Sequence, residues 1–160
     1  FCGCLSAHQI RHMKIINRRC FGVDKPRTDN LNLYIFGSQV KIQDSADTYA
    51  QAFATLTPDS VDQLCNLVSE QIYFSDPFNQ ITGKAGFRMV FDHMYTTCKD
   101  PAFDITDIAH SQHASYLRWR MTGKLKSWPH TDLDFTGMTE VRVASDGLIT
   151  HHIDHWDSAS

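Results

Sequence analysis

Asp76 is the residue whose type and position most directly suggest chemistry. The alternation of a strand over 72–76 places Asp76 on the same face as Ile72 and Phe74, the face that a strand turns toward the core. Burial raises the pKa of a carboxyl group toward the range in which it can take and return a proton, as a general base does. The alternative is a turn, because Asp-Pro commonly opens one and its carboxylate then accepts hydrogen bonds from nearby backbone amides.

The C-terminal apolar segment carries a second group of candidate residues. Strand alternation places His152, Asp154 and Trp156 on one face, and His151 and His155 on the other. The latter two are four residues apart, about 13 Å along a strand, which is too far for both to bind one metal ion. We therefore predict no metal site here and interpret the first face as a histidine, an acid that orients it, and an aromatic wall.

Trp119 lies on one face of another alternating segment, between Leu117 and Met121. In a flat sheet these three side chains would be ordinary core, but in a curved sheet they would line a cavity. Tyr49, in an early helical segment, could offer its hydroxyl group as a hydrogen-bond donor in that cavity, although a tyrosine in an apolar helical stripe usually serves packing.

Three segments have the apolar spacing of amphipathic helices, and these must position the candidate residues. Their stripes are Tyr49, Ala52, Phe53 and Leu56; Val61, Leu64, Cys65 and Val68; and Phe87, Val90, Phe91 and Met94. Thr57 and Pro58 supply a helix cap and a first-turn proline for the second helix. The short strand over 72–76 separates the second helix from the third.

After residue 100 the apolar period changes from helical to alternating. Four strands are predicted, around 103–105, 117–121, 141–143 and 148–156, with a hairpin turn at 145–147. Helices grouped first and strands grouped last indicate an α+β fold, in which three helices cover the apolar face of a mostly antiparallel sheet.

Charge divides the chain into two parts. Residues 1–45 carry seven Lys or Arg and three Asp (+4), and residues 46–160 carry eight Lys or Arg and fifteen Asp or Glu (−7), which gives −3 in total. Because 1–45 has no sustained period and has a cluster of turn formers, we predict a poorly ordered basic leader there and one domain at 46–160. The acidic domain argues against nucleic acid or an anionic membrane as a partner.

The remaining motifs point to a cytoplasmic protein without a cofactor. The chain has no apolar run long enough for a membrane helix, and the stretch after Met13 lacks the apolar core of a signal peptide. Its odd number of cysteines is most simply read as reduced thiols. It has no phosphate-binding glycine loop, nucleophile elbow or His-Glu-x-x-His pair, so no cofactor or metal is expected. A less favoured alternative is a zinc site in the leader, with the ligands Cys2, Cys4, His8 and His12.

A set of features between residues 46 and 157 can be compared with a known family. They are Tyr49 in an early helix, the strand and turn over 73–78, Gly83 ahead of a helix with Phe87 and Phe91, and the ending over 141–157. This set resembles the SnoaL-like proteins of the nuclear transport factor 2-like superfamily. The superfamily also contains steroid delta-isomerases, limonene epoxide hydrolase and scytalone dehydratase.

The resemblance implies a cone-shaped domain, commonly a homodimer, in which a strongly curved sheet wraps an apolar pocket closed by three helices. It implies that Asp76 matches the aspartate that transfers the proton in the steroid isomerases, and that Tyr49 falls near their oxyanion-donating tyrosine. Their second oxyanion donor, an aspartate, falls at Thr139, so this chain departs from that pattern. The acid that polyketide cyclases carry near the end of the last strand would be Asp154 or Asp157.

We therefore expect a cofactor-independent enzyme that binds a small apolar molecule, with isomerisation, cyclisation, dehydration and hydrolysis all open. Asp76 would be the general base, Tyr49 or His152 would stabilise developing negative charge, and Asp154 would orient His152. The expected ligand-binding side chains are Phe53, Phe74, Phe91, Leu117, Trp119, Met121 and Trp156. The alternative function is a non-catalytic module of the same fold that binds a ligand or dimerises.

Overall fold

The computed structural model describes residues 29–156, with side chains described from Lys41 onward. The elements are α1 (Asp29–Ala54), a short 3-10 helix η1 (Pro58–Ser60), α2 (Val61–Asn66), β1 (Val68–Ser75), β2 (Gln80–Thr82), α3 (Lys84–Thr97), β3 (Cys98–His110), β4 (Ser115–Leu125), β5 (Asp132–Val143) and β6 (Ile149–Trp156). The predicted α+β class is confirmed, with three α-helices and the long strands last.

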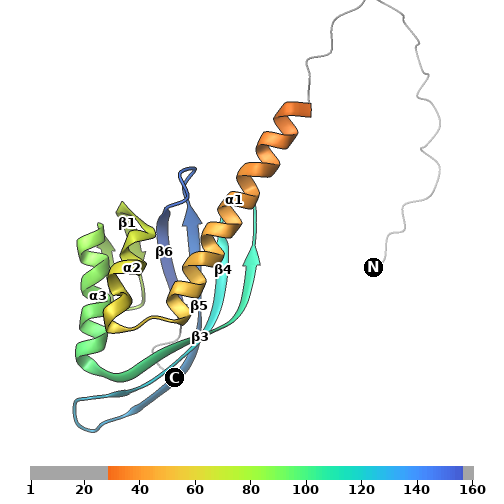
Figure 1. Ribbon diagram of the computed structural model, residues 1–160. Helices are drawn as coiled ribbons and strands as arrows, with labels where there is room; N and C mark the ends of the chain where they lie inside the picture. The colour runs from red at the N-terminus through yellow and green to blue at the C-terminus, as the bar shows by residue number, and fades with distance from the viewer. Residues whose placement is uncertain (1–28, 157–160) are drawn as a thin grey trace, which may run out of the picture.

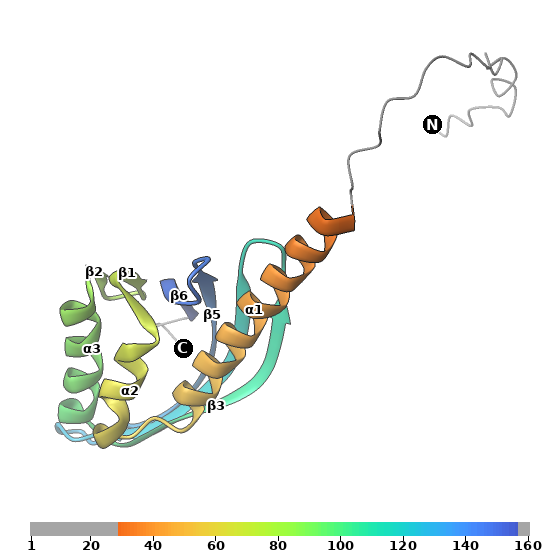
Figure 2. The ribbon, with the colours of Figure 1, turned by 45° about the horizontal axis from the view of Figure 1, so that its top comes forward.

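The strands form one open, strongly bent sheet in the order β2-β1-β6-β5-β4-β3. Every neighbouring pair is antiparallel except β1 and β6, which run parallel. Two shifts of register interrupt the pairing of β3 with β4, and such irregularities let a strand bend. The helices lie over one face of the sheet, and β3 bends as it runs from the end of α3 to a position beside α1 (Figures 1 and 2). The result is the predicted cone.

Helix α1 is longer than the sequence pattern indicated. It begins at Asp29, so residues 29–45, which we assigned to a poorly ordered leader, belong to a helix. Ile42 lies one turn before the buried Ala46 and continues the stripe of Tyr49 toward the N-terminus, but the polar residues around it hide that continuity in the sequence. The rest of the leader, with the zinc alternative, lies outside the described residues.

Two further details differ from the expected elements. Helix α2 ends at Asn66, and Val68, expected as the last residue of its stripe, starts β1 instead. Strand β2 was not predicted; it pairs with the end of β1, where Ile81 lies opposite Phe74. Three residues are too few to show an alternating pattern, so only the pairing reveals this strand.

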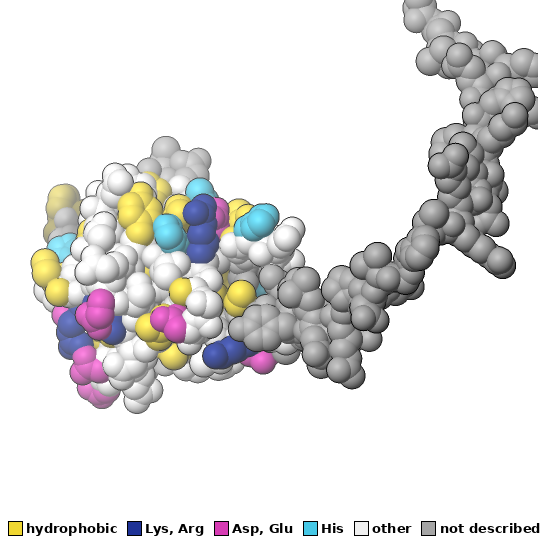
Figure 3. Space-filling model, turned by 90° about the horizontal axis from the view of Figure 1, so that it is seen from above, with side chains coloured by type: hydrophobic (Ala, Val, Ile, Leu, Met, Phe, Trp, Pro, Cys, Tyr) yellow, Lys and Arg dark blue, Asp and Glu magenta, His cyan; other side chains and the backbone are white. Residues whose placement is uncertain are grey.

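The core lies between the helices and the concave face of the sheet. Its largest members are aromatic rings from α1, α3 and β1, in edge or tilted contact with one another: Tyr49, Phe53, Phe74, Phe87 and Phe91. Among the described helices, none has the length and apolar composition that a membrane span requires. The surface seen from above carries acidic, basic and histidine side chains with only small apolar areas between them (Figure 3).

Candidate functional site

A cavity of about 800 Å³ lies between helix α3 and the concave face of the sheet. A volume of this size suits a small organic molecule. Eight of the residues that line it are Phe or Trp: Phe53, Phe74, Phe78, Phe91, Phe103, Trp119, Phe135 and Trp156. Phe78 and Met89 line the cavity and are also exposed, so they mark the side on which it opens to solvent.

Six of the seven predicted ligand-binding side chains line this cavity. They are Phe53, Phe74, Phe91, Trp119, Met121 and Trp156. The seventh, Leu117, does not line it and is packed in the core. Strand alternation correctly placed Leu117 on the concave face, but the cavity covers only part of that face.

The position of Trp119 depends on the absence of a side chain at Gly137. The two residues lie opposite each other on β4 and β5, and a Cβ atom added to Gly137 would lie 2.5 Å from the Cζ2 and Cη2 atoms of the indole ring. The ring can therefore lie across β5, where its Nε1 donates a hydrogen bond to Thr139 Oγ1 at 2.8 Å.

A second hydrogen bond links Thr139 to Asp154. An indole N–H only donates, so the oxygen of Thr139 accepts the bond from Trp119, and its own proton points to the carboxylate. The distance from Thr139 Oγ1 to Asp154 Oδ1 is 2.5 Å, and the two residues face each other across β5 and β6. Thr139 is buried. Sequence reasoning found it only as a departure from the steroid isomerase pattern, yet here it holds the carboxylate.

His152 lies on the other side of Asp154 and connects it to Tyr49. His152 Nε2 is 3.0 Å from Asp154 Oδ1, but the N–H direction is poor, so Nε2 forms no hydrogen bond with any described atom. His152 Nδ1 is 2.7 Å from the Tyr49 hydroxyl oxygen. The imidazole ring is buried and stacks on Phe74, with 5.0 Å between the ring centroids.

Tyr49 keeps its proton at neutral pH. Burial raises the pKa of Tyr49 well above its ordinary value, and the charges of Asp154 and Cys65 raise it further. Its hydroxyl group and His152 Nδ1 therefore share one hydrogen bond, whose donor depends on which ring nitrogen of His152 carries a proton.

Only one of these three residues lines the cavity. Asp154 does, with its side chain 13% exposed, whereas Tyr49 and His152 lie behind the aromatic wall. Tyr49 and His152 are therefore not among the side chains that line the cavity, whereas Asp154 lies between His152 and Thr139 and does line it.

Asp76 lies just after β1, in the turn that leads to β2. Its Oδ1 accepts hydrogen bonds from the backbone N–H groups of Phe78 at 2.7 Å and Asn79 at 2.6 Å. The Asn79 side-chain amide donates to Oδ1 at 3.1 Å and to Oδ2 at 2.9 Å. These are the bonds of the turn that the sequence left open as an alternative. The carboxylate also lines the cavity, as does Asn79, which sequence reasoning missed.

The pairing of β1 with β6 brings the two acids to one end of the cavity. Phe74 pairs with His152 and Ser75 with Ile153, so the pairing ends one residue before Asp76 and Asp154, and both acids line the cavity. Asp157, the other candidate for the last-strand acid, lies outside the described residues.

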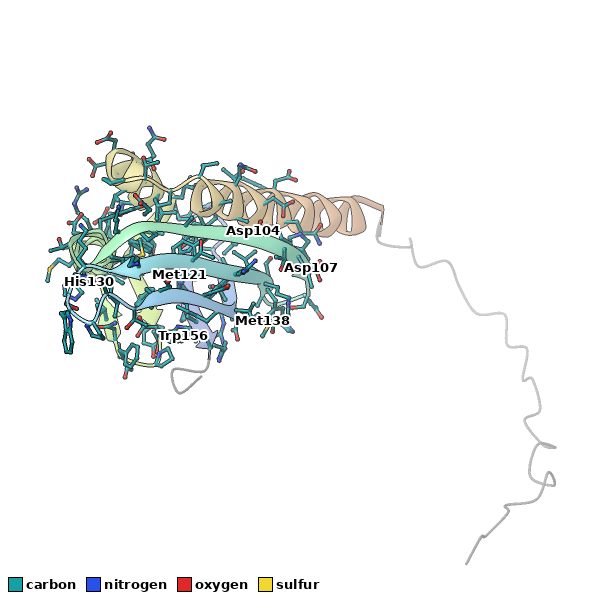
Figure 4. All side chains as sticks on the ribbon, turned by 90° about the horizontal axis from the view of Figure 1, so that it is seen from below. Asp104, Asp107, Met121, His130, Met138 and Trp156 are labelled. Carbon is teal, nitrogen blue, oxygen red and sulfur yellow. The ribbon has the colours of Figure 1, made fainter. Side chains whose placement is uncertain are left out.

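An aromatic cluster adjoins these acids. The ring of Trp156 lies 5.3 Å from that of Phe78 and 4.8 Å from that of Phe135, measured between centroids. Figure 4 shows Trp156 at one side of the sheet, away from Asp104 on β3. Among the side chains that the structure describes, no three His, Cys, Asp or Glu residues are placed to hold a metal ion.

Two comparisons with known sequences complete the description. The model of a protein family described as the SnoaL-like domain matches residues 49–152. Among curated protein sequences, none matches the chain.

Solved structures of low sequence identity have the same fold. An NTF2-like protein from Exiguobacterium is 19% identical with a TM-score of 0.62, covering 72% of this chain and 99% of its own. The epoxide hydrolase/cyclase-like enzyme SalBIII, described in pyran ring formation in the polyether salinomycin, is 14% identical with a TM-score of 0.63 and coverages of 75% and 93%. An LEH-like epoxide hydrolase from M. tuberculosis is 14% identical with a TM-score of 0.58 and coverages of 74% and 84%.

Proposed function

The chain belongs to the SnoaL-like domain family, and from this premise we propose that it is a cofactor-independent enzyme of the cyclase or isomerase type. Its substrate is a small, largely apolar organic molecule that occupies the cavity, and Asp154 transfers the proton. The observation that carries this proposal is a carboxylate that lines an aromatic cavity, accepts a hydrogen bond from Thr139 and has His152 Nε2 at 3.0 Å from its Oδ1.

The contacts of Asp154 suit a general base. Thr139 and His152 both lie against Oδ1, and among the described residues no donor is bonded to Oδ2. One oxygen is therefore fixed, while the other has a free lone pair for a substrate proton. Both oxygens of Asp76, in contrast, already accept hydrogen bonds from its own turn.

The cavity wall supports the same chemistry. Its lining is largely aromatic and aliphatic, and in such surroundings a charge that develops on the substrate interacts more strongly with fixed polar groups. Two of the similar solved structures are named as epoxide hydrolase or cyclase-like enzymes, which supports the choice of reaction class.

A panel of small substrates tests the proposal. Cyclic enones, epoxides and β-keto esters would be incubated with the protein, and the products followed by NMR. For any compound that is converted, we expect Asp154→Asn to lower kcat by about 100-fold or more, because asparagine keeps the bond from Thr139 but cannot take a proton. The matched control is Asp104→Asn, which removes one exposed carboxylate on β3 outside the cavity.

The outcome also separates the enzyme from the alternative function. Equal kcat values for Asp154→Asn and the parent protein would exclude the proposed role of this acid. Binding without conversion by the parent protein would favour the non-catalytic ligand-binding module. Binding can be followed by the fluorescence of Trp119 and Trp156, because both indole rings line the cavity.

A further inference from the structure

The charges around the cavity are one-sided. Four carboxylates line it: Asp76, Asp132, Asp134 and Asp154. No described Lys or Arg does, and His93 is the one described histidine among the lining residues. A cavity with this lining repels anions.

Two of these carboxylates, Asp132 and Asp134, are each paired with a basic side chain that does not line the cavity. Arg120 donates two hydrogen bonds to Asp134, from Nε at 2.6 Å and from Nη2 at 2.5 Å. Lys124 Nζ lies 3.2 Å from Asp132 Oδ1. These acids therefore add little attraction for a charged ligand.

The other two, Asp76 and Asp154, are called the inner carboxylates here, and they have no such basic partner among the described residues. Neither Asp76 nor Asp154 forms an ion pair with a described Lys or Arg. Their hydrogen-bond donors are neutral: backbone amides and Asn79 for the first, and Thr139 for the second. His152 lies beside Asp154, but its buried Nε2 has no aligned partner.

The two inner carboxylates place negative charge in the cavity without a basic partner among the described residues. The two carboxylates both line the cavity, one residue beyond the last paired positions of β1 and β6, and each is partly removed from water. A positive charge placed beside them would be attracted by both. Among the described residues, no Lys or Arg side chain lines the cavity to supply that charge.

The neighbouring rings favour a positive charge of a particular kind. Trp156, with Phe78 and Phe135 packed against it, forms an aromatic wall at this end of the cavity. The face of an aromatic ring attracts an organic cation, and tryptophan does so most strongly. An ammonium group with apolar substituents can contact both the rings and a carboxylate.

We propose that the ligand of this cavity carries a positively charged ammonium group, held between the Asp76 carboxylate and the Trp156 ring. Four hydrogen bonds within its turn fix the direction of Asp76, which makes it an anchor and leaves Asp154 for proton transfer. The inference rests on the proposed function, in that a small molecule occupies the cavity, and it adds the charge of that molecule.

Two probes of the same shape test the charge directly. (3-Hydroxyphenyl)trimethylammonium and 3-tert-butylphenol differ in one central atom, a positively charged nitrogen or a neutral carbon. Their dissociation constants would be measured by calorimetry on the full chain. We expect the cation to bind about tenfold more tightly, a preference that corresponds to roughly 1.4 kcal/mol.

Two variants and one control locate the preference. Asp76→Asn keeps an oxygen for the turn amides and removes the charge, so we expect it to reduce the preference to about threefold or less. Trp156→Leu should reduce it as well, which gives a second test if the first variant folds poorly. Asp104→Asn removes an exposed carboxylate outside the cavity and should leave the preference unchanged.

The possible failures are distinguishable. Equal binding of the two probes, or a full preference retained by both Asp76→Asn and Trp156→Leu, would overturn the ammonium proposal and leave the proposed enzyme intact. If neither probe binds but a neutral compound of the substrate panel is converted, the ammonium proposal is again wrong. If neither probe binds and nothing is converted, both proposals fail.

Discussion

Tyr49 and Tyr95 both carry buried hydroxyl groups, but only that of Tyr49 has a hydrogen-bond partner among the described residues. Tyr49→Phe would leave Nδ1 of the buried His152 without its hydrogen-bond partner. We therefore expect this variant to lose about 1–3 kcal/mol of unfolding free energy, measured by urea denaturation.

The matched control is Tyr95→Phe, which removes a hydroxyl group that satisfies nothing in the structure. We expect its unfolding free energy to equal or exceed that of the parent protein, because an unpaired buried polar atom is lost. Equal losses in the two variants would show that the bond from Tyr49 to His152 contributes no stability.

At the scale of residues, the sequence predicted the strand face of a side chain better than its function. Alternation correctly put His152, Asp154 and Trp156 on one side of the last strand. It could not show that the aromatic wall passes between His152 and Asp154, because that depends on how α1 and α3 cover the sheet. For Asp76, the local Asp-Pro pattern allowed both an inward acid and a turn, and the structure contains features of both.

At the scale of elements, the packing of Trp119 against strand β5 requires a glycine at position 137. A methyl group at Gly137 would overlap the indole ring, so we expect Gly137→Ala to displace Trp119 from Thr139. Overpacking of this kind costs about 1–3 kcal/mol of unfolding free energy. The displacement should change the near-UV circular dichroism of the tryptophans, and the stability loss should appear in urea denaturation.

Gly37→Ala is the control for this change. Gly37 lies in α1 with no atom within 4 Å of an added Cβ, so the same substitution should be neutral or stabilise the helix by up to about 1 kcal/mol. An unchanged near-UV spectrum and full stability in Gly137→Ala would mean that β5 or the ring can shift without cost, and that Trp119 is not held as described.

The elements that the sequence predicted are those with enough residues to show a period. Helix α3 and the four long strands were predicted, and their order alone indicated the fold class. Strand β2 and the first part of α1 were not. The three residues of β2 form a strand only because β1 is beside them, and the stripe of α1 is interrupted around Ile42.

At the scale of the whole molecule, the structure moves the boundary between the basic and the acidic part of the chain from residue 46 to residue 29. Residues 1–28 carry six Lys or Arg and one Asp (+5), and residues 29–160 carry nine Lys or Arg and seventeen Asp or Glu (−8), which again sum to −3. The part that builds the cavity is therefore more acidic than the boundary at residue 46 indicated. The homodimer implied by the family resemblance stays a prediction.

This net negative charge leads to a prediction about salt. A molecule with an excess of eight negative charges over residues 29–160 attracts a cation from a distance, and dissolved ions screen that attraction. We expect the affinity for (3-hydroxyphenyl)trimethylammonium to fall roughly threefold between about 0.05 and about 0.5 M NaCl. The affinity for uncharged 3-tert-butylphenol should not fall.

The cation should still bind more tightly at the higher concentration, because its contacts with Asp76 and Trp156 lie inside the cavity, where screening is weak. If salt instead abolished the whole preference, the attraction would come from the general field of the molecule, and Asp76→Asn would then behave like Asp104→Asn.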